Sequence, residues 1–241
     1  LIFTGYKKVK TTQTKLHLLR NTIHFGGQTG WLYGVAFLPL ADVFAIEFTA
    51  PIWTALLAIL FLKEKLNRYR ALSIFLGFTG IIIILRPGFQ IIQPAAFIVL
   101  FASFCFASTY VFTRYMSATE SPLTIIFYMN LVQLPLGFIA SLYNWALPSL
   151  ESWPWLALLG LTGIGSHFCF ANAFRYGDAI VVTPIDFIRL PLIALIGWSI
   201  YNESWDLVIF VGGTVIFSGN LINLLAEQKF AKKSSETNTS A

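Results

Sequence analysis

The 241-residue chain is poor in charge and in the residues that carry most catalytic chemistry. Only 11% of its residues are charged, and three are histidine. An average soluble domain has about 25% charged residues. The two cysteines, Cys105 and Cys169, lie inside apolar stretches without the spacing of metal ligands, so we interpret them as small packing residues. The sequence predicts no metal and no cofactor.

Sequence motifs for catalysis are also missing. The zinc-hydrolase pattern His-Glu-x-x-His does not occur. Ser166 and His167 are adjacent, but neighbouring residues on a helix point about 100° apart, so they do not easily form a nucleophile and its base. We predict no catalytic residue and no enzyme activity.

A net charge of +5 raises the question of nucleic acid. The basic residues, however, lie in short stretches between apolar segments, where anionic lipid headgroups attract them. No basic stripe is left for a duplex. We expect no nucleic-acid partner.

Apolar sequence dominates instead: 56% of the residues are hydrophobic and the mean hydropathy is +0.72. A bilayer-crossing helix needs about 17–25 mostly apolar residues, and backbone groups in lipid must be paired within the segment. The sequence therefore predicts an all-α integral membrane protein, a polytopic bundle of eight transmembrane helices. These helices are Leu16–Leu40, Val43–Leu62, Tyr69–Leu85, Pro94–Phe112, Leu123–Tyr143, Trp155–Phe174, Ile180–Tyr201 and Leu207–Leu225.

The basic residues sort onto one side of these segments. With the N-terminal arm in the cytoplasm, every Lys and Arg except Arg86 and Arg189 falls on the cytoplasmic side, as the positive-inside rule expects. We therefore expect a multi-pass protein of a bacterial inner or plasma membrane. Its cytoplasmic parts would be 6–20, 63–70, 113–122, 175–179 and the polar tail 229–241.

Two parts of the chain resemble each other. Glu47 and Asp186 each precede a phenylalanine, a proline, an apolar run and a glutamate. The two acids are 139 residues apart, and so are the two glutamates, Glu64 and Glu203. Because the charge rule places Glu64 inside and Glu203 outside, the copies have opposite orientation. This predicts two inverted-topology repeats, an arrangement typical of secondary transporters.

The repeat sets the predicted domain boundaries. We assign 1–88 to a first repeat of which only the last three helices are visible, 89–228 to a complete second repeat of five helices, and 229–241 to the tail. A symmetric architecture would have two further N-terminal helices, ten in all. The start at Leu1, without methionine or signal peptide, agrees with a fragment.

Several motifs occur in the order of a known family. They are Phe37-Leu-Pro-Leu-Ala-Asp42, Ile46-Glu-Phe-Thr-Ala-Pro-Ile52, Leu62-Lys-Glu-Lys65, Gly77-Phe-Thr-Gly-Ile-Ile-Ile-Ile-Leu-Arg-Pro-Gly88 and Thr183-Pro-Ile-Asp-Phe-Ile-Arg-Leu-Pro191 with Glu203. Over residues 30–226 the chain resembles the EamA-type drug/metabolite transporter superfamily, and within it the branch that includes S-adenosylmethionine and riboflavin carriers. The resemblance implies a permease of ten helices with both termini inside, whose first two helices are absent here.

Ionisable residues inside apolar segments are the first candidates for a site, because each costs about 2.5–3.5 kcal/mol on insertion scales. Glu47 lies near the outer end of its helix, and Asp186 lies toward the inner end of the matching helix. Arg189 lies one turn from Asp186 on the same face. It would receive a substrate carboxylate or phosphate, restrained by Asp186 when the site is empty. Two structural alternatives stay open: an ion pair that only positions the helix, and a Glu47 that merely faces outer water.

Two prolines at corresponding places, Pro51 and Pro184, are predicted helix breaks. A break at Pro184 would expose a positive helix end that suits an anionic substrate. Thr183 and Asp186 also form the pattern of a capping box with proline at the first helical position, which would give Asp186 a purely structural role.

Polar residues at helical spacing complete the predicted site. His24, Gln28 and Trp31 share one face of the first segment. Asn130 and Ser166 belong to stripes on two later segments, which we expect to face the bundle interior because lipid satisfies neither amides nor hydroxyls. His24 is a candidate proton relay; the alternative is a histidine that is only hydrogen-bonded.

The first segment has a second face of small residues. Gly26, Gly30 and Gly34 recur every four residues, a pattern that lets helix backbones approach closely. We interpret these glycines as a packing surface.

These features predict a secondary active transporter that moves a small organic metabolite by alternating access, coupled to protons or to a second solute. The substrate would be similar to S-adenosylmethionine or riboflavin, or derived from an amino acid. The partners are the metabolite and the lipid bilayer, and the sequence leaves a homodimer open. A channel or a non-transporting scaffold is the alternative, although the polar stripes are too short and interrupted for a continuous pore.

Overall fold

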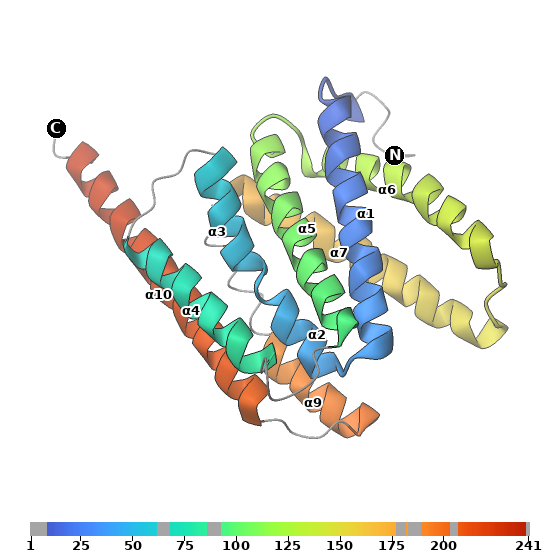
Figure 1. Cartoon of the computed structure of the whole chain (residues 1–241). Coiled ribbons are helices and arrows are strands. Elements are labelled where there is room, and N and C mark those ends of the chain that lie inside the picture. Colours follow the sequence, from blue (N-terminus) through green and yellow to red (C-terminus); the bar gives the residue numbers. More distant parts are fainter. Residues whose placement is uncertain are drawn as a thin grey trace. The chain divides into compact units, whose positions relative to one another are not determined.

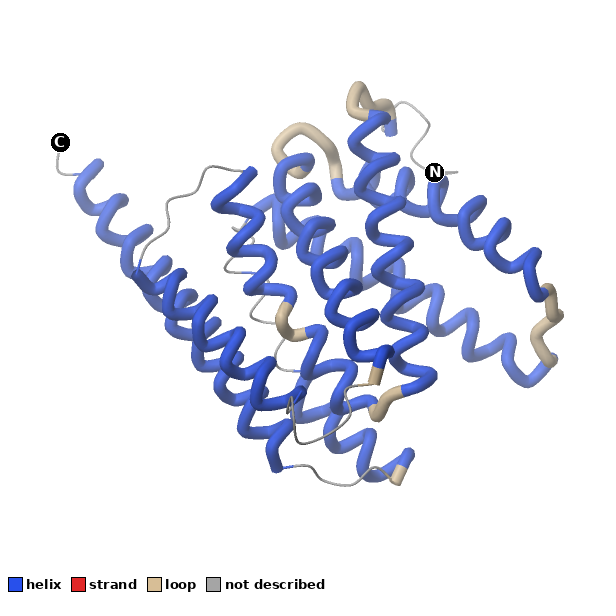
Figure 2. Tube along the Cα trace, in the orientation of Figure 1, coloured by secondary structure: helices blue, strands red, loops and turns tan. Residues whose placement is uncertain are grey.

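The computed structural model describes residues 9–61, 68–85, 93–176, 182, 189–202 and 207–239. Within these ranges every regular element is helical (Figure 1; Figure 2), which confirms the predicted all-α class. The elements are α1 (Thr14–Phe37), α2 (Leu40–Glu47), α3 (Ala50–Phe61), α4 (Arg68–Leu85), α5 (Pro94–Met116), α6 (Pro122–Ser141), the 3₁₀ turns η2 (Leu142–Asn144) and η3 (Leu150–Ser152), α7 (Trp153–Tyr176), α9 (Arg189–Tyr201) and α10 (Leu207–Thr239).

Four helical stretches are long and apolar enough to cross a membrane, judged by length and composition. They are Asp42–Phe61, Pro94–Met116, Pro122–Ser141 and Leu150–Tyr176, and shorter apolar helices cover Ala71–Ile84 and Phe210–Ala226. Large apolar side chains are exposed along several helices, for example Leu134 at 74% and Leu161 at 71%. Such a surface suits lipid chains better than water.

The chain folds as two compact units. Unit 1 comprises Leu1–Phe25 and Phe112–Asp178, and unit 2 comprises Gly26–Val111 and Ala179–Ala241. Helices α1 and α5 each contribute to both units. Each unit also takes residues from both repeats that the sequence predicts.

In unit 2, α5 packs against both α2 and α3. Val43 of α2 and Val99 of α5 are fully buried in one apolar cluster, and Leu57 of α3 lies with Ala107 of α5 in the next cluster along. Because Val99 and Ala107 recur at helical spacing on α5, one face of this helix contacts both α2 and α3.

Close packing between α1 and α5 depends on glycine, but on a different face from the predicted one. A Cβ on Gly27 would lie 2.8 Å from Cys105 Cβ, one on Gly30 would lie 3.2 Å from Ile98 Cγ2, and one on Gly34 would collide with Val99. Gly26 has open space around it. The prediction that Gly26 belongs to the packing face is therefore wrong, because the contact follows i, i+3 and i+7 spacing and not every fourth residue.

Also in unit 2, α4 and α10 lie side by side and antiparallel (Figure 1). A Cβ on Gly80 would lie 2.7 Å from the Gly212 carbonyl oxygen, and a Cβ on Gly219 would lie 3.1 Å from the Ser73 carbonyl oxygen. The positions 73 and 212 are 139 residues apart, as are 80 and 219. By the repeat offset, Gly80 corresponds to Gly219 and Ser73 to Gly212, so the two contacts are equivalent with the repeats exchanged.

In unit 1, the end of α5 is tied to the end of α7. Arg114 Nη1 and Ser117 Oγ both donate to the Phe174 carbonyl oxygen, at 3.1 and 3.2 Å. Helix α6 begins at Pro122 behind a Ser121 N-cap, whose hydroxyl accepts from the Thr124 N–H at 3.1 Å. These bonds fix the ends of α5 and α7 and the start of α6.

Candidate functional site

The predicted helix Val43–Leu62 is interrupted in its first third. Helix α2 ends at Glu47, Phe48 and Thr49 form a turn, and α3 starts at Ala50. The Thr49 carbonyl oxygen accepts the first hydrogen bonds of α3, from the N–H of Ile52 at 2.9 Å and of Trp53 at 3.3 Å. Pro51 thus lies in the first turn of a new helix, where a missing N–H is tolerated.

The interruption has a local chemical cause. In a continuous helix the N–H of residue 51 would donate to the carbonyl of Glu47, four residues earlier, but proline has no N–H. Ser103 of α5 supplies the missing donor, because its hydroxyl lies 3.2 Å from the Glu47 carbonyl oxygen. The same hydroxyl lies 2.8 Å from Thr49 Oγ1. One serine therefore bonds to both sides of the break.

The Glu47 carboxylate lies at this break and is 8% exposed. Its Oε2 accepts a hydrogen bond of 2.7 Å from the indole N–H of Trp31 on α1, and Trp31 contacts the edge of Phe44. The structure thus brings together two predicted site residues that are sixteen positions apart in the sequence.

Aromatic rings line the other side of the break. The indole N–H of Trp53 donates to Thr49 Oγ1 at 3.2 Å. The Trp53 ring makes edge contacts with Phe78 of α4 and Phe104 of α5. A carboxylate, two hydroxyls and two indoles therefore meet where α2 passes into α3. This combination suits a proton, an organic cation or a flat polar ring.

Helix α9 packs against α2, so the helix that follows Asp186 adjoins the helix that ends at Glu47 (Figure 1). Arg189 is the first residue of α9. Pro184 and Asp186 lie outside the described residues, as does the side chain of Arg189. Their predicted roles stay predictions.

Predicted residues in unit 1 fall into two groups. His24 is buried, its Nδ1 lies 2.7 Å from Gln133 Nε2, and its ring makes an edge contact with His167. By contrast, Asn130 and Ser166 are exposed and bond to carbonyls of their own helices, those of Ile126 and Gly163. Hydroxyl and amide side chains in helices often bond to the preceding turn in this way. That these two side chains face the bundle interior stays a prediction.

Gln28, the remaining predicted residue, lies in unit 2 and is exposed. Sequence reasoning also missed several buried polar residues. Thr49 and Ser103 resemble the many hydroxyl residues of apolar helices, and no sequence signal distinguishes them. His17 and Asn21 did carry a signal, because they share helical spacing with His24.

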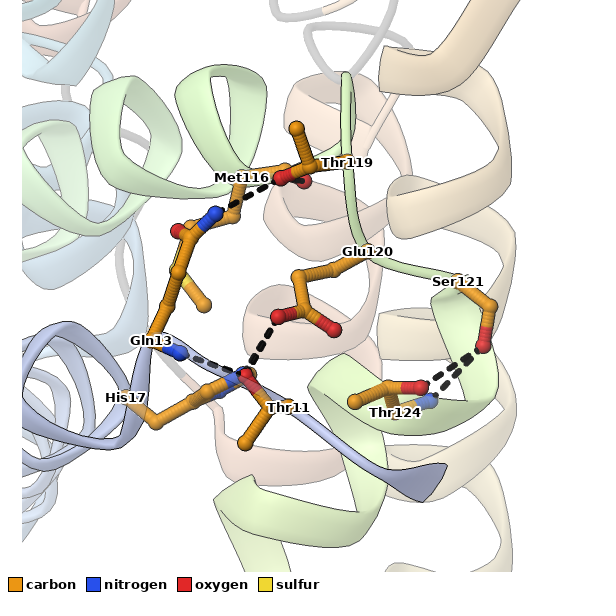
Figure 3. Close-up of polar contacts among 8 residues, drawn as sticks. All are labelled: Thr11, Gln13, His17, Met116, Thr119, Glu120, Ser121 and Thr124. Atoms are coloured by element: carbon orange, nitrogen blue, oxygen red, sulfur yellow. Dashed lines mark hydrogen bonds and ion pairs between the residues drawn. The ribbon is translucent and has the colours of Figure 1, made fainter. Parts of the chain in front are cut away.

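Another acid that the sequence did not single out is Glu120, which follows α5. It is 8% exposed, accepts a hydrogen bond from the Thr11 hydroxyl, and has one oxygen 3.9 Å from Nε2 of His17. Figure 3 shows this carboxylate between the N-terminal arm and the start of α6. Gln13 adds a second link, because its side-chain amide donates to Thr119 Oγ1 at 2.7 Å.

Comparison with known proteins gives a consistent result. A model described as the EamA-like transporter family matches residues 1–86 and 93–225. The S-adenosylmethionine uptake transporter of Rickettsia bellii is 28% identical over 97% of this chain and 80% of that protein. The riboflavin transporter of Brucella anthropi is 28% identical, covering 92% and 80%. The riboflavin transporter of Vibrio cholerae is 30% identical, covering 87% and 71%.

A solved crystal structure also resembles this fold. It matches with a TM-score of 0.60 and 13% sequence identity, covering 91% of this chain and 90% of that chain. At this identity the likeness shows the fold alone.

Proposed function

Because the chain belongs to the EamA-like transporter family, we propose that it is a secondary carrier that works by alternating access in a bacterial inner membrane. The family and the relatives show a membrane transporter of small metabolites, not an enzyme. The mechanism, the coupling and the substrate are the proposal. It depends above all on one observation, the buried Glu47 carboxylate at the interruption between α2 and α3.

The contacts of α4 and α10 support an inverted repeat. In a two-fold pseudo-symmetric pair, a contact between residues i and j has a counterpart in which the two repeats exchange places. The contact of Gly80 with Gly212 and that of Gly219 with Ser73 are related in this way by the repeat offset. Such a relation is common in alternating-access carriers, in which one repeat rocks against the other around a central site.

The interrupted helix supports a site at the break. Discontinuous helices place polar backbone and side chains at membrane depth, where transporters bind substrates and coupling ions. We place the substrate near the break, between α2 with Glu47 and α9 with Arg189. Asp186 would restrain Arg189 when the site is empty.

Glu47 is the proposed coupling residue. A carboxylate buried among apolar and aromatic side chains is stabilised by gaining a proton or an organic cation. S-Adenosylmethionine carries a sulfonium and an ammonium group, and both suit a carboxylate beside indole rings. Riboflavin has no such charge, but its flat ring would stack on the same indoles. We therefore propose one of these two kinds of metabolite as the substrate.

Reconstituted liposomes test the proposal. The protein should catalyse saturable counterflow of labelled S-adenosylmethionine or riboflavin, and a proton gradient should drive accumulation of the transported one. Glu47→Gln should abolish gradient-driven accumulation, because the amide oxygen still accepts from Trp31 but the amide does not gain or lose a proton. Counterflow should persist for riboflavin, which has no cationic group, and weaken for S-adenosylmethionine. The matched control is Glu151→Gln, at an exposed acid in η3, which should change neither.

Two results would contradict the proposal. An ohmic current without saturable counterflow would identify a channel. Gradient-driven accumulation by Glu47→Gln at the wild-type level would place the coupling elsewhere.

A further inference from the structure

A second group of polar residues lies on α1 within unit 1. His17, Arg20, Asn21 and His24 follow i, i+3, i+4 and i+7 spacing and therefore share one face of the helix. Their exposed fractions are 0, 3, 0 and 5%. We call these four residues the α1 polar stripe. Burying a guanidinium, an amide and two imidazoles costs free energy unless they find partners, so their burial requires a chemical reason.

The hydrogen bonds of Arg20 hold its guanidinium in place without neutralising it. Its Nε donates to Thr113 Oγ1 at 2.8 Å, and its Nη1 donates to Asn21 Oδ1 at 2.5 Å. Both acceptors are neutral. Among the described residues no carboxylate lies within 4.0 Å of this guanidinium. A buried arginine that served only the fold would be expected to have an acidic partner.

Other polar atoms of the α1 polar stripe have no hydrogen-bond partner among the described residues. Nδ2 of Asn21 is buried and has no hydrogen-bond partner in the described part of the protein, and neither ring nitrogen of His17 has one. Buried donors are normally satisfied. The amide oxygen of Asn21 accepts from Arg20, so the unpartnered N–H groups of Asn21 belong to a side chain that is held beside the guanidinium.

Glu120 does not take the place of the missing anion. Its carboxylate is engaged with Thr11 and approaches His17 at 3.9 Å (Figure 3). Arg20, in contrast, is bound to Thr113, which lies seven residues before Glu120, inside α5. The acid thus adjoins the His17 end of the α1 polar stripe and leaves the Arg20 end with positive charge.

We propose that the α1 polar stripe binds an oxyanion, a carboxylate or a phosphate. The Arg20 guanidinium supplies the charge, the Asn21 amide and one His17 N–H donate hydrogen bonds, and Thr113 positions the guanidinium. Arginine suits this role because its planar fork binds two oxygens while one nitrogen stays anchored. The anion belongs either to a metabolite or to a lipid headgroup, which share this chemistry, and only the first source rests on the proposed carrier function.

The binding test uses the full chain in phosphatidylcholine nanodiscs. Sodium phosphate and sodium acetate should raise the Tm relative to sodium chloride of equal ionic strength, by about 2–4 °C at saturating anion. Arg20→Gln should abolish this shift without lowering the Tm in chloride, because it removes an uncompensated buried charge. The matched control is Lys15→Gln, an exposed cation on the same helix, which should keep the shift.

A second variant covers the case in which Arg20→Gln does not fold. Asn21→Ala keeps the charge and removes the unpartnered donor, and should weaken anion affinity by about tenfold. The proposal is overturned if the wild-type protein shows no anion-dependent shift, or if Arg20→Gln and Asn21→Ala keep the full shift.

Two further arms identify the source of the anion. If a metabolite supplies it, S-adenosylmethionine should raise the Tm more than its decarboxylated form does, and Arg20→Gln should remove this difference. If a lipid headgroup supplies it, nanodiscs of phosphatidylglycerol should raise the Tm without added salt and suppress the phosphate shift. Loss of the phosphate shift in Arg20→Gln would support the anion site even if counterflow assays contradicted the carrier function.

Discussion

Replacing Ser103 by alanine is the sharpest test of how the interrupted helix is held. Ser103 is fully buried and bonds to both sides of the break, through the Glu47 carbonyl oxygen and Thr49 Oγ1. Alanine removes the hydroxyl and fits the same space. Pro51 has no N–H that could replace the lost donor.

The expected loss follows from these two bonds. Thr49 Oγ1 still accepts from the Trp53 indole, so that group stays partly satisfied. The Glu47 carbonyl loses its bond from the serine, and a typical intramolecular hydrogen bond contributes about 1 kcal/mol net. We therefore expect Ser103→Ala to lower the free energy of unfolding by about 2 kcal/mol, a large part of the roughly 5–15 kcal/mol typical of proteins.

The assay is reversible unfolding of the purified protein in mixed micelles by titration with SDS, followed by tryptophan fluorescence. Ser108→Ala is the matched control on the same helix, because the Ser108 hydroxyl bonds only to the carbonyl of Phe104 in its own helix. It should change stability by less than about 0.5 kcal/mol.

A double-mutant cycle of Ser103→Ala and Pro51→Ala tests whether the serine replaces the donor that proline lacks. Pro51→Ala restores the N–H that can donate to the Glu47 carbonyl, so Ser103→Ala should cost less in that background, by about 1 kcal/mol. If the two substitutions are additive within about 0.5 kcal/mol, the serine does not replace the proline's missing donor and the explanation of the break fails.

Two further predictions concern the repeats. Gly80→Ala should destabilise the protein by about 1–3 kcal/mol in the same assay, because its Cβ would meet Ile216 and a backbone oxygen. Gly160→Ala, in open space on α7, should be neutral or stabilising by up to about 1 kcal/mol, and equal effects would contradict the close contact of α4 and α10. Single cysteines placed in Lys63–Arg70 should react with a membrane-impermeant maleimide from the cytoplasmic side and those in Asn202–Asp206 from the opposite side; labelling from one side would rule out inverted repeats.

Long apolar runs predicted the helices, and a few ionisable residues within them predicted part of the site. Glu47 and Trp31 were both identified as candidate site residues from local pattern. Neither pattern predicts that the Trp31 indole donates to the Glu47 carboxylate. That contact depends on how α1 and α2 pack, which involves side chains from three helices.

Arg20 shows the opposite case. Its charge and its place near the start of a segment grouped it with the cytoplasmic cations, yet it lies 3% exposed among polar side chains in unit 1. A charge count records where a residue lies along the chain but not which neighbours surround it. The periodicity of His17, Arg20, Asn21 and His24 on one helix face was the available signal.

The amino-acid sequence by itself determined that the chain is helical and membrane-embedded, because apolar runs of about 17–25 residues have the length at which a helix crosses the bilayer with its backbone groups paired. It also indicated the family, through motifs that are local in the chain. Only the tertiary structure decided that α2 and α3 are separated by a turn which Ser103 bridges, and that Arg20 is anchored by Thr113. The reason is physical: a hydrogen bond to a hydroxyl on another helix depends on packing over tens of residues, and no local pattern records it.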